Sequence, residues 1–166
     1  LVLAALRAGK PVVTANKALL AEHGQEIFHE AALRRVPIYF EASVGGGIPI
    51  IKALREGLIA NRFQLIYGIL NGTCNYILTR MSEDHMSFEA ALSGAQAMGC
   101  AEADPSFDID GIDSAHKATV LASLAYNGCV DFKQVYVEGI RHVSLADVEF
   151  ARQLGYVIKL LVIIRR

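Results

Sequence analysis

The sequence predicts an α/β fold, and three observations support that prediction. Hydrophobic residues make up 53% of the 166 residues and charged residues only 20%, a balance that suits a chain with a large core. Short apolar runs rich in β-formers alternate with segments of helical periodicity. Glycine, proline and helix-capping residues separate these segments. We therefore expect a mixed sheet with helices packed on one face.

In the first part of the chain, glycine and proline residues indicate where elements begin and end. Gly9 and Pro11 end a first helix, Gly24 interrupts the apolar face of a second, and Pro49 suits the first turn of a third. Three glycines at 45–47 form a turn. The elements expected here are helix 1–7, strand 12–14, helix 17–35, strand 37–42 and helix 49–59.

In the second part, the same signals recur with clearer caps. Ser87 and Ser144 are suitable N-caps, Gly99 ends a helix, and Asn71-Gly72-Thr73 turns a strand into a helix. A polar, acidic loop is expected over 101–111. The expected elements are strand 63–70, helices 74–81, 87–98 and 112–126, strand 135–140, helix 145–154 and strand 156–164.

Composition excludes several classes of function. The chain has 16 Lys and Arg against 17 Asp and Glu, and no basic run exceeds two residues, so we expect no nucleic-acid partner. No apolar stretch approaches the ~20 residues of a membrane span. Three cysteines with no C-x-x-C pair fit a reducing, cytoplasmic location. The sequence has no initiator Met and its last segment is an apolar strand, so we expect a fragment of a longer protein.

The densest polar cluster lies between Glu102 and Lys117, where five carboxylates fall in an otherwise apolar chain. Asp113 and Lys117 are four residues apart on a predicted helix and share one face. A lysine held there can donate a proton to a developing alkoxide. The alternative is a solvated surface ion pair. An EF-hand is excluded, because Lys117 occupies the position of the bidentate glutamate.

Two strand-to-helix junctions are further candidates. The glycine turn after Glu41 either brings backbone groups close to an anion or a cation, or simply connects a strand to a helix. Lys17 follows Thr14-Ala15-Asn16 and either holds a phosphate or carboxylate or is an exposed first-turn lysine. His116 and His142 are interpreted as packing or surface residues rather than metal ligands.

Four segments together resemble the homoserine dehydrogenase family. They are VVTANKALLA (12–21), EASVGGGIPII (41–51), GILNGTCNYIL (68–78) and AQAMGCAEADPSFDIDGIDSAHK (95–117). The resemblance covers nearly the whole chain, and the spacing from Glu102 to Lys117 is its most specific part. It implies an NAD(P)-dependent oxidoreductase, with NADP or NAD as cofactor, that interconverts L-aspartate 4-semialdehyde and L-homoserine in amino-acid biosynthesis.

The resemblance also implies a role for individual residues. Lys117 would be the proton donor, with Asp113 beside it. Glu102 would bind the substrate ammonium, and the same pocket would be lined by Gly72, Thr73 and Asp108. Lys17 and Gly99 would lie on the cofactor side. A monovalent cation such as Na⁺ or K⁺ would be held by Glu41 with the backbone of Val44, Gly46 and Ile48.

At the level of domains, the resemblance implies that 1–42 is the C-terminal remnant of a Rossmann-type nucleotide-binding domain. Residues 43–166 would be a truncated catalytic and dimerisation domain of a homodimer. Two departures from the family pattern stand out. Cys100 replaces an aromatic residue, and the glycine-rich dinucleotide loop is absent. The alternative reading is therefore a substrate-binding and dimerisation module that is catalytically incomplete. An unrelated α/β domain with a metal-binding acidic loop is a third reading.

Overall fold

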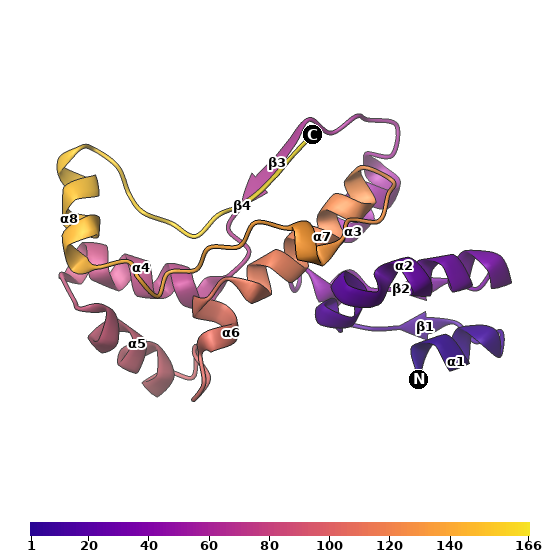
Figure 1. Cartoon of the computed structure of the whole chain (residues 1–166), viewed down its shortest axis with the longest axis horizontal. Helices are drawn as coiled ribbons and strands as arrows, with labels where there is room; N and C mark the ends of the chain where they lie inside the picture. Colours follow the sequence, from indigo (N-terminus) through magenta and orange to yellow (C-terminus); the bar gives the residue numbers. More distant parts are fainter. The chain divides into compact units, whose positions relative to one another are not determined.

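The computed structural model describes residues 1–166, which divide into two compact units (Figure 1). The first comprises Leu1–Ile66, Ala115–Val135 and Ile164–Arg166, and the second comprises Tyr67–Ser114 and Tyr136–Ile163. No helix in the chain is both long enough and apolar enough to cross a bilayer.

The first unit begins with a small helix–strand–helix–strand arrangement. Its elements are α1 (Val2–Arg7), β1 (Val12–Val13), α2 (Lys17–Arg34) and β2 (Ile38–Tyr39). β1 and β2 pair in parallel, with Val12 opposite Ile38 and Val13 opposite Tyr39, and α2 connects them. This strand–helix–strand unit matches the expected remnant of a parallel sheet.

Local signals explain where α2 begins and ends. Asn16 caps its start, because the side-chain Oδ1 accepts a hydrogen bond from the backbone N–H of Leu19 at 3.0 Å. The helix runs through Gly24 without a break and ends at Arg35, whose φ of 55° lies in the left-handed region. Its buried face contains Leu20, Ile27 and Ala31.

The remainder of the first unit is built from short turns and one long helix. A 3₁₀ turn η1 (Glu41–Ser43) leads through the glycine turn to α3 (Ile50–Lys52) and a π-helical turn η2 (Ala53–Gly57). Helix α7 (Ile112–Ala125) starts in the second unit and continues into the first, followed by the 3₁₀ turn η3 (Phe132–Gln134). The single helix expected over 49–59 is therefore wrong, since a π-helical turn replaces its second half.

The second unit is helical, with its core around α4. The elements are α4 (Gly72–Asp84), α5 (Phe88–Ala97), α6 (Ser106–Ile109) and α8 (Leu145–Gln153). Helix α4 contacts α5, α6 and α8, as the left part of Figure 1 shows. The buried core cluster consists of Cys74, Ile77, Leu78, Met81, Ala91, Ala95, Ile109, Ile140 and Val148. Ser87 caps α5 and Ser144 caps α8, as the sequence predicts, and Ser144 also forms a capping box with Asp147.

The second sheet is smaller than expected. It contains only β3 (Leu65–Gly68) and β4 (Val162–Arg165). The strand expected over 135–140 is wrong, because this segment joins no strand and instead packs against the end of α6, where the backbone N–H of Ile140 donates to the carbonyl of Ile109 at 2.7 Å. The loop expected over 101–111 contains α6. The last strand begins at Val162 rather than 156, because the Asn75 side chain bonds both backbone groups of Leu160.

Candidate functional site

The centre of the candidate site is Asn71, a buried residue that is only 3% exposed. Its side-chain oxygen accepts a hydrogen bond from the backbone N–H of Cys74 at 2.8 Å and thereby caps α4. Its Nδ2 donates to Oδ1 of Asp108 at 2.7 Å and to Oδ2 of Asp113 at 2.9 Å. One amide group therefore holds two carboxylates that lie 37 and 42 residues away in the sequence.

The two carboxylates create a negative environment at the start of α4. The Cys74 thiol is fully buried and donates to the backbone carbonyl of Asp108, with a distance of 3.1 Å between sulfur and oxygen. Burial, together with the negative charges of Asp108 and Asp113, raises the pKa of Cys74 to about 12. A positively charged group of a substrate would be stabilised in the same environment.

The loop after α5 is fixed to the start of α4 by Thr73. The Thr73 hydroxyl donates to the carbonyl of Cys100 at 2.8 Å. Gly99 adopts a φ of 71°, which glycine accepts without strain, and lies directly before Cys100. The Gln96 side chain donates to the carbonyls of Glu102 and Ala103 and so holds the backbone of Glu102. Glu102 itself is exposed to solvent.

A sharp corner between α6 and α7 places Asp108 and Asp113. Asp108 lies on the single turn of α6, and Asp113 lies in the first turn of α7 and is 5% exposed. Gly111 between them has a φ of 84°, and a Cβ there would lie 3.0 Å from the carbonyl of Glu138. The positive φ therefore favours glycine at this corner, and the nearby carbonyl leaves little room for a Cβ.

Lys117 follows Asp113 by four residues on α7 and is half-buried. Residues with this spacing lie on the same side of a helix. The same unit of chain contains His116, whose buried ring packs against Phe132 with centroids 4.5 Å apart and whose Nε2 lies 3.4 Å from Oε1 of Glu22. His142 is exposed. Both histidines thus occupy the packing and surface environments that the sequence predicts.

The glycine turn gives Glu41 a definite structural role. Its carboxylate accepts hydrogen bonds from the backbone N–H groups of Ile51 at 2.9 Å and Lys52 at 2.8 Å, and so caps α3. Gly45 and Gly46 have φ angles of 78° and 58°. The N–H of Ile48 bonds the carbonyl of Gly45, and Val44 is fully buried. No group of three or more His, Cys, Asp or Glu side chains is arranged to hold a metal ion.

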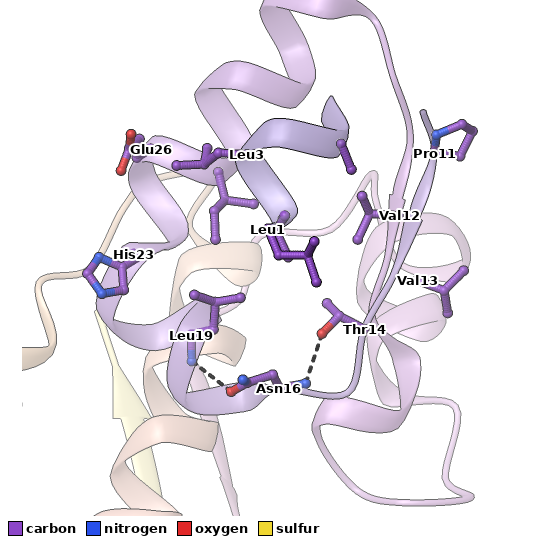
Figure 2. Close-up of a pocket in the computed structure, with 13 residues that line it drawn as sticks. Leu1, Leu3, Pro11, Val12, Val13, Thr14, Asn16, Leu19, His23 and Glu26 are labelled. Atoms are coloured by element: carbon purple, nitrogen blue, oxygen red, sulfur yellow. Dashed lines mark hydrogen bonds between the residues drawn. The ribbon is translucent and has the colours of Figure 1, made fainter. Parts of the chain in front are cut away.

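The first unit contains a cavity of about 830 Å³ between α1, β1 and α2 (Figure 2). Its walls are mainly apolar, with Thr14 and Asn16 at the point where β1 leads into α2. The backbone N–H of Asn16 donates to the Thr14 hydroxyl at 3.1 Å, which fixes this junction, as Figure 2 shows. Lys17 follows Asn16 but is not among the residues that line the cavity.

Among the residues predicted from the sequence, the second unit brings together Asp108 and Asp113, both bonded to Asn71, whereas the hydroxyl of Thr73 bonds Cys100. This unit adds Asn71, which the sequence predicts only as part of a turn from a strand into a helix. The available signal was its position: an Asn directly before a helix start is a strong N-cap candidate. Its bonds to two distant carboxylates have no local signature.

Comparison with known proteins gives consistent relatives over the whole chain. The family model described as "Homoserine dehydrogenase" matches residues 49–165, and the model described as "Homoserine dehydrogenase, NAD binding domain" matches residues 1–41. A homoserine dehydrogenase of Pseudomonas aeruginosa is 55% identical over 166 residues, covering 100% of this chain and 38% of its own length. One from Neisseria gonorrhoeae is 53% identical over 165 residues, with 99% and 38% covered.

Solved structures agree. The crystal structure of a homoserine dehydrogenase from Thiobacillus denitrificans has a TM-score of 0.97 at 53% identity, covering 99% of this chain and 38% of that one. A hyperthermophilic archaeal homoserine dehydrogenase in complex with NADPH has a TM-score of 0.86 at 32% identity, covering 99% and 48%. The α/β class is thus confirmed, and the chain spans 38% of the length of these two curated relatives. Because the first family model alone matches well over half of its residues, the chain belongs to the homoserine dehydrogenase family.

Proposed function

We propose that this chain supplies the substrate-binding region and the proton donor of an NAD(P)-dependent oxidoreductase. The reaction interconverts L-aspartate 4-semialdehyde and L-homoserine. The observation that supports it most directly is the convergence of Asp108 and Asp113 on Asn71, with Lys117 one turn further along α7. Such a set can bind an amino-acid ammonium and protonate an oxygen.

In this proposal each residue has one task. The exposed carboxylate of Glu102 and the carboxylate of Asp108 bind the substrate ammonium, while Gly72 and Thr73 line the pocket at the start of α4. Asp113 holds a negative charge one turn before Lys117, and Lys117 donates a proton to the carbonyl oxygen as it becomes an alkoxide. The nicotinamide, when bound, supplies the hydride.

The cofactor proposal concerns NADP or NAD. A nicotinamide dinucleotide is supported by the match of residues 1–41 to a NAD-binding domain model and by the NADPH complex of the archaeal relative. The polar junction of Thr14 and Asn16 at the end of β1 is where ligands gather in open α/β sheets. We propose that Lys17 and Gly99 lie on the cofactor side, and that 1–42 and 43–166 are the two domains.

A monovalent cation, Na⁺ or K⁺, is proposed at the glycine turn. Two hydrogen bonds to Glu41 leave further lone pairs on its carboxylate, so capping α3 and binding a cation are compatible. The backbone oxygens of Val44, Gly46 and Ile48 would complete the site. Homoserine-dependent reduction of NADP, measured in the presence of Na⁺, K⁺ or neither, tests this cation site. Equal rates in all three buffers would contradict the cation site.

The test of the function is homoserine-dependent reduction of NADP, followed by absorbance, with this chain and with the full-length chain that contains it. We expect activity in the full-length chain only. In that protein Lys117→Met should lower kcat by roughly 10²- to 10⁴-fold, the usual contribution of general acid–base catalysis, while dinucleotide binding persists. Unchanged turnover would remove Lys117 from the reaction. Activity that is absent from both folded chains would favour the incomplete binding module.

A homodimer in the cytoplasm is the proposed state of the protein. Three apolar side chains on one side of β3 and its extension are more than half exposed: Leu65, Tyr67 and Ile69. On β4, Ile163 is 65% exposed. An apolar strand surface of this kind is typical of an interface. Light scattering on the full-length chain should therefore give twice the monomer mass, and a monomer at micromolar concentration would contradict the proposal.

A further inference from the structure

The segment Glu138–Arg141 crosses directly over the corner between α6 and α7. A Cβ on Gly139 would collide with the carbonyl oxygen of Ile109, so only glycine fits at the crossing. On the other side of the crossing, Gly111 lies close beneath the carbonyl of Glu138. The 2.7 Å hydrogen bond from Ile140 N–H to Ile109 closes the contact. This crossing segment thus packs on the backbone that separates Asp108 from Asp113.

Arg141 ties both ends of α6 to the crossing segment. Its Nε donates to Oδ1 of Asp110 at 2.6 Å, and its Nη2 donates to Oδ2 of the same carboxylate at 2.8 Å. The same Nη2 donates to the hydroxyl of Ser106 at 3.1 Å. Ser106 is the first residue of α6, and Asp110 is its C-cap. The Ser106 N–H in turn donates to Asp104 at 3.1 Å.

A helix as short as α6 needs such external ties. It has four residues, and a single helical turn is unstable by itself because nucleation fixes several residues for one hydrogen bond. Asp108 belongs to this turn, and its bond to Asn71 therefore depends on groups that hold the turn in place. The planar guanidinium, with two parallel hydrogen bonds to one carboxylate, fixes orientation as well as distance.

We propose that Arg141 is a positioning residue for Asp108 and Asp113, the carboxylates assigned to the substrate site. By clamping Ser106 and Asp110, it holds α6 and the following corner so that Asp108 and Asp113 both meet Asn71. This role rests on the proposed function, since it assumes that these carboxylates bind and orient substrate. It does not require Arg141 to touch the substrate.

A positioning role for Arg141 and a purely stabilising role predict different effects of its removal. The side chains of Arg141 and Asp110 are 43% and 41% exposed, and ion pairs at this exposure contribute little to the free energy of unfolding. A change in orientation of a binding group, in contrast, has a large effect on turnover. The clamp should therefore be seen in kinetics far more than in thermal stability.

The experiment uses the full-length enzyme with Arg141→Ala, Arg141→Lys and a matched control, Arg80→Ala. Arg80 forms ion pairs with Glu83 and Asp84 of its own helix, α4. We expect Arg141→Ala to lower kcat/KM for homoserine by roughly tenfold with KM for the dinucleotide unchanged. The kcat/KM of Arg141→Lys should lie between those of wild type and Arg141→Ala, since an ammonium cannot make the bidentate pair. Arg80→Ala should match wild type.

Two further measurements make the outcome decisive. Asp110→Asn combined with Arg141→Ala should be no worse than Arg141→Ala alone, because Asp110 acts only through Arg141. Cys74, which donates to the Asp108 carbonyl, should react faster with a thiol reagent in Arg141→Ala, a readout independent of activity. Additive kinetic losses, or unchanged Cys74 reactivity, would overturn the proposal. If wild type does not oxidise homoserine but Cys74 still becomes reactive, the proposed function fails and the clamp remains.

Discussion

Asn71 shows what a single buried side chain contributes. Its amide satisfies a helix N-terminus and two carboxylates, while its backbone carbonyl accepts from the Asn75 side chain at 2.9 Å. The sequence Asn71-Gly72-Thr73 predicts a turn into a helix from local chemistry alone. It does not predict the two carboxylate partners, because these depend on how α6 and α7 return to α4. The sequence therefore predicts candidate residues for the site, and long-range packing determines which of them meet.

The three cysteines are expected to differ sharply in reactivity. Cys100 and Cys129 are exposed, whereas Cys74 is buried with a pKa raised to about 12 by burial and by the charges of Asp108 and Asp113. Since the thiolate is the nucleophile, Cys74 should stay unmodified at pH 8 in the native protein. Iodoacetamide treatment followed by mass spectrometry should give adducts at Cys100 and Cys129 only, and at Cys74 after denaturation. Rapid native labelling of Cys74 would contradict the buried, hydrogen-bonded thiol.

At the level of elements, local signals predicted helices better than strands. The helices capped by Ser87 and Ser144 begin where expected, because an N-cap needs only residues within the next turn. The expected strand 135–140 has suitable β-formers but forms no ladder. A strand depends on a partner elsewhere in the chain, and here the backbone of Ile109 takes the hydrogen bond instead.

The sequence does not predict helix α6, because this helix also depends on partners elsewhere in the chain. Its sequence is short, acidic and preceded by a proline, which is typical of a loop, and a turn of four residues has little intrinsic stability. Its position is set by bonds to Arg141 and to Asn71, neither of which is local. Elements that depend on distant ties are thus the ones that sequence patterns describe least well, and in this chain one of them carries Asp108.

For the molecule as a whole, the shifted pKa values predict stability that declines on both sides of neutrality. The pKa values of three carboxyl groups are lowered mainly by a hydrogen bond. The partner is Arg34 for Glu30, Ser106 for Asp104 and Arg141 for Asp110. These carboxylates bind fewer protons in the folded state, so their contribution, which is small for the solvent-accessible Asp104 and Asp110, is present above about pH 4.5 and is lost as pH falls through the lower folded values. The raised pKa of Cys74 acts in the opposite range, because the unfolded thiol loses its proton from about pH 8.5 upward.

Glu30 gives the clearest test of the acidic side. It is a buried carboxylate of α2 that accepts from Arg34 at 2.9 Å and from Arg7 of α1 at 3.4 Å, and so joins the two helices. Glu30→Gln should lower the free energy of unfolding above about pH 4.5, with the difference from wild type shrinking as pH falls and the wild-type carboxylate is protonated. Urea denaturation between pH 3 and 8 measures this difference. The control is Glu56→Gln, whose pair with Lys52 spans 4.0 Å at the exposed surface and should contribute little at any pH. A Glu30→Gln effect that stays constant down to pH 3 would show that this carboxylate contributes through packing and not through its charge.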